Sequence, residues 1–188
     1  MAADSDSDGL DATLLARAAR GEVAAARLLT ARRAPRLLAL ATRMLNDPAE
    51  AEDVTQEAFL RLWRAAEDLA QGPAPIGAWL HRVAANLCLD RLRRRRGVAL
   101  DDVAAPADPG PGALERLAAA DRAAALRAAL AALPDRQRAA VCLRHFDDRS
   151  NPEIAQALGV SVEAVESLLA RGRRALAAAL AGHREDAA

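Results

Sequence analysis

The sequence predicts an all-α protein made of two small helical domains joined by a flexible linker. Three observations support this fold class. Alanine and arginine, both good helix formers, are abundant, and no segment shows the alternating β-branched pattern of a strand. Apolar residues recur at spacings of three and four on either side of one stretch rich in Pro, Gly and Asp, residues 97–113. The length of 188 residues is enough for two such domains.

Helical patterns and their breaks give the expected domain boundaries. Residues 1–10 are acidic and polar and are expected to be disordered. The first domain is expected over 11–96, with helical patterns at 11–20, 22–45, 48–70 and 76–96. After the acidic linker at 97–113, the second domain is expected over 114–182, with breaks at Leu133-Pro134 and from Phe146 to Arg149.

The pattern at 48–70 has one apolar and one mixed face. The apolar stripe contains Val54, Ala58, Phe59, Leu62 and Trp63. The opposite face places a leucine among acids, an amide and a base, namely Asp53, Gln56, Glu57, Leu60 and Arg64. Such a face suits a protein partner, and a plain solvated face is the alternative interpretation.

The pattern at 76–96 ends in a run of arginines. Its inner face is expected to hold Trp79, Leu80, Val83, Leu87 and Cys88, and its outer face His81, Arg82, Asn86, Asp90 and Arg93. Residues 91–96 contain five arginines, which a single neighbouring Asp90 cannot neutralise. A surface that follows phosphates is predicted, and a solvated helix end is the alternative. If the run neutralises about four phosphates, the logarithm of the affinity for duplex DNA should fall with the logarithm of the salt concentration at a slope of about −3.6.

The segment from Leu133 to Leu176 predicts a helix-turn-helix. Ser150, Pro152 and Glu153 form a capping-box sequence that begins one short helix. Gly159 supplies the positive φ at which that helix can stop, and Ser161 caps the next one. The second helix of such a motif can enter a DNA major groove, and an ordinary helical hairpin is the alternative.

The second helix of this motif also has two assignable faces. The residues expected to face the core are Val162, Val165, Leu169, Gly172 and Leu176. The residues expected on the outer face are Glu163, Glu166, Ser167, Ala170, Arg171 and Arg174.

Charge and composition narrow the function classes. All 26 basic residues are arginine and they balance 26 acids, but residues 20–97 carry a net +5 and residues 125–184 a net +3. Two basic blocks separated by an acidic connector favour a nucleic-acid partner. No apolar run is long enough to insert into a membrane, the N-terminus does not resemble a signal peptide, and two distant cysteines suggest buried thiols in a cytoplasmic protein. No nucleophile and base pair, metal cluster or phosphate loop is visible, so neither an enzyme nor a cofactor or metal is expected.

Three segments together resemble one family. DVTQEAFLRLW, AWLHRVAANLCLDRLRRRR and LPDRQRAAVCLRHFDDRSNPEIAQALGVSVEAVESLLARGRRAL look like bacterial RNA polymerase sigma factors of the sigma-70 family. The size and layout resemble the extracytoplasmic-function (ECF) group, which keeps only regions 2 and 4. The resemblance implies promoter-specific transcription initiation with core RNA polymerase and promoter DNA as partners, and an anti-sigma factor that controls a stress regulon.

The resemblance also implies roles for individual residues. Core polymerase would contact Asp53, Gln56, Glu57, Leu60 and Arg64. The minus-ten element would be read and opened by Gln71, Gly72, Asn86, Asp90, Arg91, Arg93 and Arg94, which must hold a flipped base and a single strand. The minus-thirty-five element would be read by Arg144, Arg149, Glu163, Glu166, Ser167, Ala170, Arg171 and Arg174.

The chain also departs from the family pattern. Glu166 and Leu168 stand where many members carry basic residues, so backbone contacts are expected from arginines around them. A glutamate can accept from a cytosine amino group but repels phosphate. Two alternatives are a sigma-like decoy that binds an anti-sigma factor without promoter activity, and an ordinary helix-turn-helix repressor.

Overall fold

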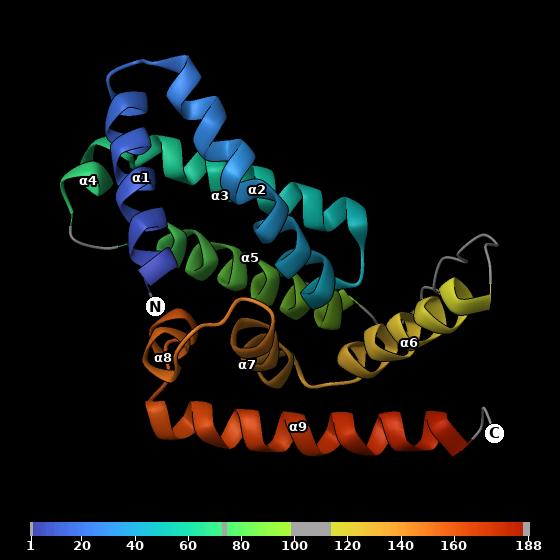
Figure 1. The fold of residues 1–188 in the computed structure, drawn as a ribbon. Coiled ribbons are helices and arrows are strands. Elements are labelled where there is room, and N and C mark those ends of the chain that lie inside the picture. The colour runs from blue at the N-terminus through green and yellow to red at the C-terminus, as the bar shows by residue number, and fades with distance from the viewer. Residues whose placement is uncertain (1, 73–74, 99–113, 186–188) are drawn as a thin grey trace.

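The computed structural model describes residues 2–72, 75–98 and 114–185, and the secondary structure in these ranges is entirely helical. The helices fall into two groups (Figure 1). The N-terminal bundle comprises α1 (Ala2–Ala19), α2 (Val23–Leu45), α3 (Pro48–Arg64), α4 (Ala66–Gln71) and α5 (Ile76–Val98). The C-terminal bundle comprises α6 (Leu114–Ala131), α7 (Asp135–His145), α8 (Asn151–Leu158) and α9 (Val162–Glu185). The all-α prediction is confirmed.

The N-terminal bundle is organised around α2, which packs against α1, α3 and α5. Leu29, Leu37 and Leu40 of α2 are fully buried, and Leu62 of α3 and Leu80 of α5 pack into the same core. The buried positions of α2, which include Ala25, Leu29, Arg33, Leu37 and Leu40, recur every three or four residues, as a one-sided buried stripe requires. The bundle therefore leaves the opposite face of α3 exposed, while part of α5 contacts the other bundle.

The prediction of a disordered segment at residues 1–10 is wrong, because α1 begins at Ala2. Asp11 is fully buried and forms an ion pair with Arg33, which is itself 4% exposed. Arg33 also contacts Asp8 at 3.2 Å, and Leu14 and Leu15 pack into the core. Acidic residues that look like a solvated tail in the sequence thus dock α1 onto α2.

The boundaries of α3 follow from local signals. Asn46 ends α2 in the left-handed conformation, with a φ of 51°, and the Asp47 side chain accepts a hydrogen bond from the Glu50 amide at 3.1 Å. Pro48 occupies the first helical position, where its missing N–H is not needed. The single helix expected over 48–70 is divided at Ala65 into α3 and α4.

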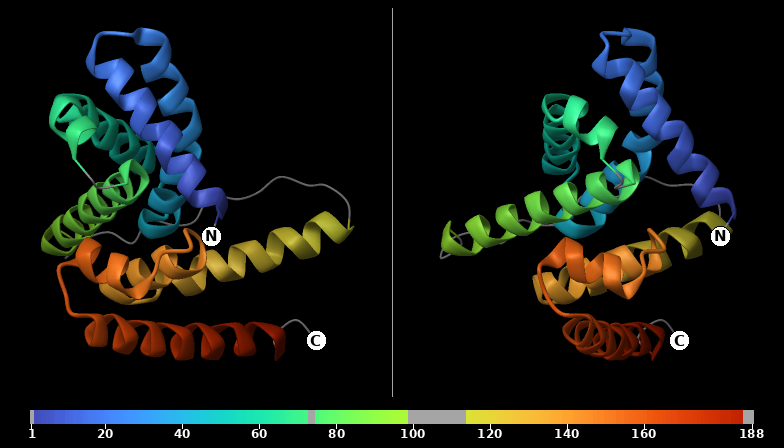
Figure 2. Two further views of the ribbon diagram at one scale, coloured as in Figure 1. Left: turned by 60° about the vertical axis from the view of Figure 1, so that its left-hand side comes forward. Right: turned by 90° about the vertical axis from the view of Figure 1, so that its left-hand side faces the viewer.

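The C-terminal bundle is held together by α9, which packs against α6, α7 and α8. The closest approach is at Gly172, where an added Cβ would lie 2.7 Å from Cγ2 of Val141 in α7. Only glycine permits this distance, so Gly172 sets the spacing between α7 and α9. Figure 2 shows α9 running beneath the other helices of this bundle.

The two bundles pack directly on each other. In Figures 1 and 2, α8 and α7 lie against α5, and α7 also contacts α2. Residue spacing does not predict this contact, because a tether of the expected composition would allow the domains to separate. Most of the predicted linker at 97–113 lies outside the described residues. No helix in the described ranges is long and apolar enough to cross a membrane.

The two cysteines are buried free thiols, as expected. Burial raises the pKa of Cys88 to about 12, and burial likewise raises the pKa of Cys142 to about 12. Both therefore remain protonated near neutral pH and pack as small apolar side chains.

Candidate nucleic-acid interface

The helix-turn-helix forms through the predicted caps. The Ser150 Oγ accepts from the Glu153 amide at 3.5 Å, and Glu153 Oε2 accepts from the Ser150 amide at 2.8 Å, which completes a capping box. Gly159 ends α8 with a φ of 61°, and Ser161 Oγ accepts from the Ala164 amide at 3.2 Å. These contacts fix the start and end of α8 and the start of α9, so the motif is confirmed.

The Glu153 carboxylate has a lowered pKa. Partial burial acts to raise it, but hydrogen bonds from the Ser150 hydroxyl and amide, and an ion pair with Arg149 at 3.1 Å, outweigh that effect. The capping box is therefore formed by the charged side chain at neutral pH.

The outer face of α9 is open to solvent. Val165 and Leu169 are buried against the bundle, as predicted, and Gly172 of the same stripe lies against Val141 of α7. The predicted reading residues Glu163, Glu166, Ser167, Arg171 and Arg174 are exposed and Ala170 is half-buried. A hydrogen bond from its own backbone amide, and a second one from the Ser161 hydroxyl, lower the pKa of Glu163. The face thus joins two carboxylates near the start of α9 to two guanidinium groups further along.

The two arginines predicted before α8 are not equally available. Arg144 is exposed and donates to the Arg149 carbonyl at 3.0 Å. The Arg149 side chain is only 19% exposed, because it lies between Glu153 and His81 of α5. In this structure Arg144 can reach a phosphate and Arg149 is engaged elsewhere.

The mixed face of α3 points away from the rest of the N-terminal bundle. Asp53, Gln56 and Arg64 are exposed, and Glu57 is half-buried beside Arg61. A hydrogen bond from Arg61 lowers the pKa of Glu57, so this carboxylate stays charged. Leu60 is 49% exposed at the centre of this face. An apolar side chain ringed by charges is the surface that the sequence predicted for a protein partner.

The arginine run of α5 is less free than the sequence suggested. Arg95 bridges Asp47 and Glu50, each at 2.9 Å, and Arg91 lies 3.9 Å from Glu50. Arg96 pairs with Asp135 at 2.7 Å and Arg93 pairs with Asp90. The sequence analysis counted only Asp90 as a neighbouring acid, but the fold also brings Asp47, Glu50 and Asp135 to the run, so most of its arginines are paired. Of the five arginines in this run, the exposed Arg94 is the one that has no acidic partner within the described ranges.

The rest of the predicted minus-ten surface is divided between exposed and covered positions. Gln71 and Gly72 are exposed at the end of α4, Asn86 is exposed and Asp90 is half-buried on α5. Residues 73–74 of the adjoining loop lie outside the described residues. His81, expected on the outer face, is 2% exposed because α8 and the segment before it cover that turn of α5.

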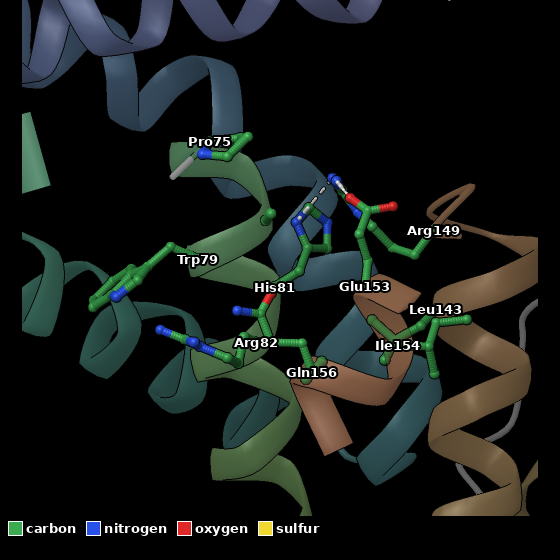
Figure 3. A pocket seen from close by; sticks show the side chains of 11 residues that line it. Pro75, Trp79, His81, Arg82, Leu143, Arg149, Glu153, Ile154 and Gln156 are labelled. Atoms are coloured by element: carbon green, nitrogen blue, oxygen red, sulfur yellow. Dashed lines mark hydrogen bonds and ion pairs between the residues drawn. The ribbon is translucent and has the colours of Figure 1, made fainter. Parts of the chain in front are cut away.

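A small crevice marks this contact (Figure 3). It holds about 60 Å³ and is lined by Trp79 and Arg82 of α5 and by Ile154 and Ala157 of α8. Drug-sized ligands occupy pockets of roughly 300–1,000 Å³. The crevice is therefore a seam between helices rather than a ligand site. Among the described residues, no group of three His, Cys, Asp or Glu side chains could hold a metal ion.

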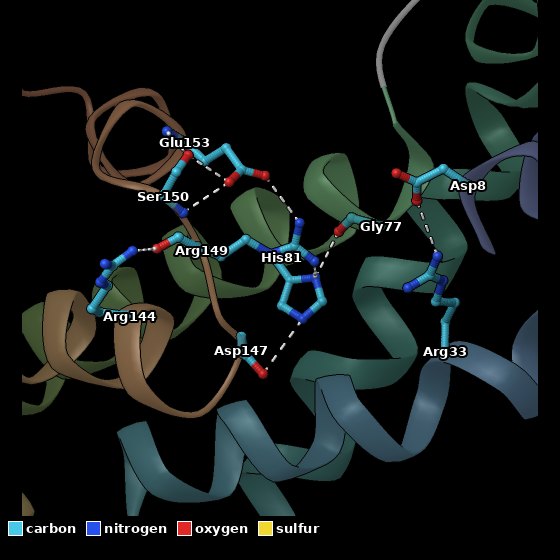
Figure 4. A network of polar contacts seen from close by, with 9 residues as sticks. All are labelled: Asp8, Arg33, Gly77, His81, Arg144, Asp147, Arg149, Ser150 and Glu153. Atoms are coloured by element: carbon cyan, nitrogen blue, oxygen red, sulfur yellow. Dashed lines mark hydrogen bonds and ion pairs between the residues drawn. The ribbon is translucent and has the colours of Figure 1, made fainter. Parts of the chain in front are cut away.

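The seam involves residues that sequence reasoning did not assign to any site. His81 and Asp147 lie 68 and 2 positions from Arg149 in the chain, yet the three side chains meet between the bundles (Figure 4). Arg138 of α7 donates to the Met44 carbonyl of α2 at 2.6 Å. No periodicity or spacing could have found these contacts, because they depend on how two separately predicted bundles dock.

The fold and site define a class: a helical protein with an exposed helix-turn-helix face on α9 in one bundle, and with the exposed Leu60 face of α3 and the basic end of α5 in the other. Comparisons with known proteins agree. The family model described as Sigma-70 region 2 matches residues 29–98, and that of Sigma-70 region 4 matches residues 113–176. These two ranges correspond to most of the N-terminal bundle and most of the C-terminal bundle.

Curated relatives of this chain are named as RNA polymerase sigma factors of the ECF group. The ECF RNA polymerase sigma factor SigM of Mycobacterium tuberculosis is 36% identical over 170 residues, covering 89% of this chain and 83% of that protein. SigE of Mycolicibacterium smegmatis, also an ECF RNA polymerase sigma factor, is 36% identical over 167 residues, covering 85% of this chain but 63% of that protein. The chain therefore spans less than two thirds of some relatives that it matches.

A solved structure extends the likeness to the whole fold. CnrH, in complex with the cytosolic domain of CnrY, matches with a TM-score of 0.68 and 30% identity, covering 92% of this chain and 98% of that one. The chain belongs to the sigma-70 family of RNA polymerase sigma factors, in its ECF group.

Proposed function

We propose that this chain binds core RNA polymerase and directs promoter-specific initiation, with the N-terminal bundle on the minus-ten element and the C-terminal bundle on the minus-thirty-five element. The observation that carries the proposal is the coexistence, in one chain, of the exposed partner face on α3 and the exposed reading face on α9. Family membership supports it, because this family consists of transcription initiation factors. Its place of action would be the cytoplasm, with polymerase.

The residue assignments follow the same proposal. Polymerase contacts come from the face of α3 around Leu60, where Asp53, Gln56, Glu57 and Arg64 form a charged rim. Minus-ten contacts come from residues at the end of α4 and on α5, namely Gln71, Gly72, Asn86, Asp90, Arg91, Arg93 and Arg94. Minus-thirty-five contacts come from Arg144 and from Glu163, Glu166, Ser167, Ala170, Arg171 and Arg174, with Arg149 joining them once it is released from the seam.

A partner protein that controls the chain is part of the proposal. The CnrH structure is a complex with the cytosolic domain of another protein, and that fold matches this one along almost its full length. An anti-sigma factor that covers α3 and α5 would keep the chain from polymerase.

The deciding experiment mixes the purified chain with core polymerase and genomic DNA fragments and maps transcript starts. New start sites that share one upstream sequence are expected. Tight binding to core polymerase without new starts would instead favour the sigma-like decoy.

A matched pair of variants tests the polymerase face. Leu60→Ala should weaken binding to core polymerase about tenfold or more, because a central apolar anchor can contribute more than 1 kcal/mol. Leu28→Ala is the control, since Leu28 is 50% exposed but lies on α2. If titrations show that both variants lose the same affinity for core polymerase, Leu60 does not lie in the interface.

A further inference from the structure

The N-terminal helix α1 lies against both parts of the proposed minus-ten surface. It packs on α4, whose end carries Gln71 and Gly72, and on α5, which carries the other residues of that surface. Figure 1 shows α1 beside α4 and α2. The match to Sigma-70 region 2 begins at residue 29, after the end of α1. The support that α1 gives to this surface is therefore a feature that the family match does not describe.

A buried ion pair fixes α1 in this place. Asp11 of α1 is fully buried and pairs with Arg33 of α2, which is 4% exposed. The Asp11 carboxylate also lies 3.2 Å from Arg32 Nε, and Arg33 Nη2 lies 3.2 Å from the Asp8 carboxylate. Removing two charges from water is costly, and good geometry with additional hydrogen bonds must offset that cost. These contacts therefore hold the Arg33 guanidinium in one position.

The Arg33 guanidinium lies directly against the start of α5. Gly77 stands in the first turn of α5, and a Cβ added there would lie 3.0 Å from Nη1 and 3.1 Å from Cζ of Arg33 (Figure 4). A free arginine would move aside for such an atom, but Arg33 is held by Asp11. Glycine at position 77 thus allows α5 to begin in contact with Arg33.

The three residues form a continuous path from α1 to the proposed minus-ten surface. Asp11 sets the position of Arg33, and Arg33 sets how closely the first turn of α5 approaches α2. Flipping a base out of the duplex is costly, so the groups that receive it must already be in place. A displacement of the start of α5 relative to α4 would disturb that arrangement.

We propose that Asp11 is a positioning residue for promoter opening: through Arg33 and Gly77 it holds the start of α5 at the distance from α4 that capture of an unpaired base requires. The inference rests on the proposed function for the role of α4 and α5. Asp11 is buried and acts through these neighbours rather than by touching DNA.

The test separates promoter opening from polymerase binding. Asp11→Asn keeps the shape of the side chain and removes the charge that holds Arg33. In the complex with core polymerase, the permanganate reactivity of thymines in the opened region of a duplex promoter should fall at least fivefold. The affinity for core polymerase should change less than twofold, because the exposed face of α3 is untouched.

A second template distinguishes positioning from a general loss of stability. On the same promoter with mismatched, already unpaired bases in the minus-ten region, transcription by Asp11→Asn should return to within twofold of the wild type. Equal losses on the duplex and the mismatched template would show that Asp11 has only a structural role, and would overturn the proposal.

Glu22→Gln is the matched control. Glu22 pairs with Arg17 at the turn between α1 and α2, and both residues are exposed. This variant also removes an ion pair formed by α1, but one that does not involve Arg33, so promoter opening should stay at the wild-type level. A loss equal to that of Asp11→Asn would contradict the proposed path.

A double-mutant cycle tests the path itself. Gly77→Ala places a Cβ against the held guanidinium and should lower permanganate reactivity at least fivefold. In the Asp11→Asn background Arg33 can move aside, so adding Gly77→Ala should cost less than a further twofold. Losses that multiply in the double variant would show that the two positions act independently, and would overturn the proposal.

The wild-type chain separates this inference from the proposed function. A wild-type chain that binds core polymerase and opens no promoter would contradict both. A wild-type chain that opens promoters, together with an Asp11→Asn variant that opens them equally well, would contradict the positioning role alone.

Discussion

Neighbouring arginines at the end of α5 have different surroundings, although they look equivalent in the sequence. Arg94 is exposed with no acidic partner in the described chain, whereas Arg95 joins α5 to α3 through Asp47 and Glu50 and donates to the Leu45 carbonyl. The first is available for phosphate and the second holds the bundle together.

This difference predicts opposite effects of two alanine substitutions. Arg94→Ala should flatten the salt dependence of promoter binding by the polymerase complex by about 0.9 in log–log slope, because one phosphate contact is lost. Arg95→Ala should leave that slope unchanged and lower the free energy of unfolding by about 1 kcal/mol, a partial value since the side chain is 38% exposed. Filter binding over a salt series and urea unfolding measure the two effects. Identical salt-dependence slopes for Arg94→Ala and the wild type would show that Arg94 does not contact DNA.

Among the elements, the helix-turn-helix was the most predictable. Its capping box, its glycine turn and both faces of α9 follow from residue spacing, because each depends only on neighbours a few positions away. A helix was expected at 11–20, but the part of α1 before residue 11 was missed, for the opposite reason. Its stability depends on Asp11 reaching Arg33, 22 positions further along, and no local pattern reports such a pair.

The capping box gives α8 a pH dependence. The folded pKa of Glu153 is depressed, so its contribution to stability is complete above the unfolded pKa of about 4.3 and is lost as pH falls through the folded pKa. Glu153→Gln should therefore cost about 0.5 kcal/mol at pH 7, a value reduced for screening at a carboxylate that is 39% exposed. Urea unfolding from pH 7 to pH 3 should show the difference from wild type shrinking as the pH falls. A difference that is constant with pH would show that the charge of Glu153 has no role.

At the scale of the molecule, the sequence predicted two domains and their order but not their contact. Each bundle is specified by its own apolar stripes, whereas the seam uses scattered residues such as His81, Arg138 and Asp147. Sites on α3 and α9 could be predicted because each lies on one helix face. The contact of α7 and α8 with α5 could not be predicted, because it depends on how the two bundles dock.

The docking of the bundles predicts how the whole chain unfolds. Arg138 is 6% exposed, and it donates to Met44 in the N-terminal bundle and to Ala131 and Leu133 in its own. Arg138→Ala leaves three carbonyls without this donor, which should cost about 2–4 kcal/mol and act first on the C-terminal bundle.

Two probes separate the bundles in that experiment. Trp63 lies on α3, whereas Trp79 lines the crevice beside α8, so fluorescence is read in a Trp79→Phe background and far-ultraviolet circular dichroism reports all helices. The two probes should give one transition in the wild type, and in Arg138→Ala the dichroism should change at lower denaturant than the fluorescence. Coincident transitions in the variant would show that Arg138 does not couple the bundles.

The exposed face of α9 has a consequence for how the chain would search a genome. Under the proposed function, this face can sample intact double helix while the two bundles stay docked, because its carboxylates and arginines already point to solvent. A first encounter between α9 and duplex DNA then requires no rearrangement of the chain.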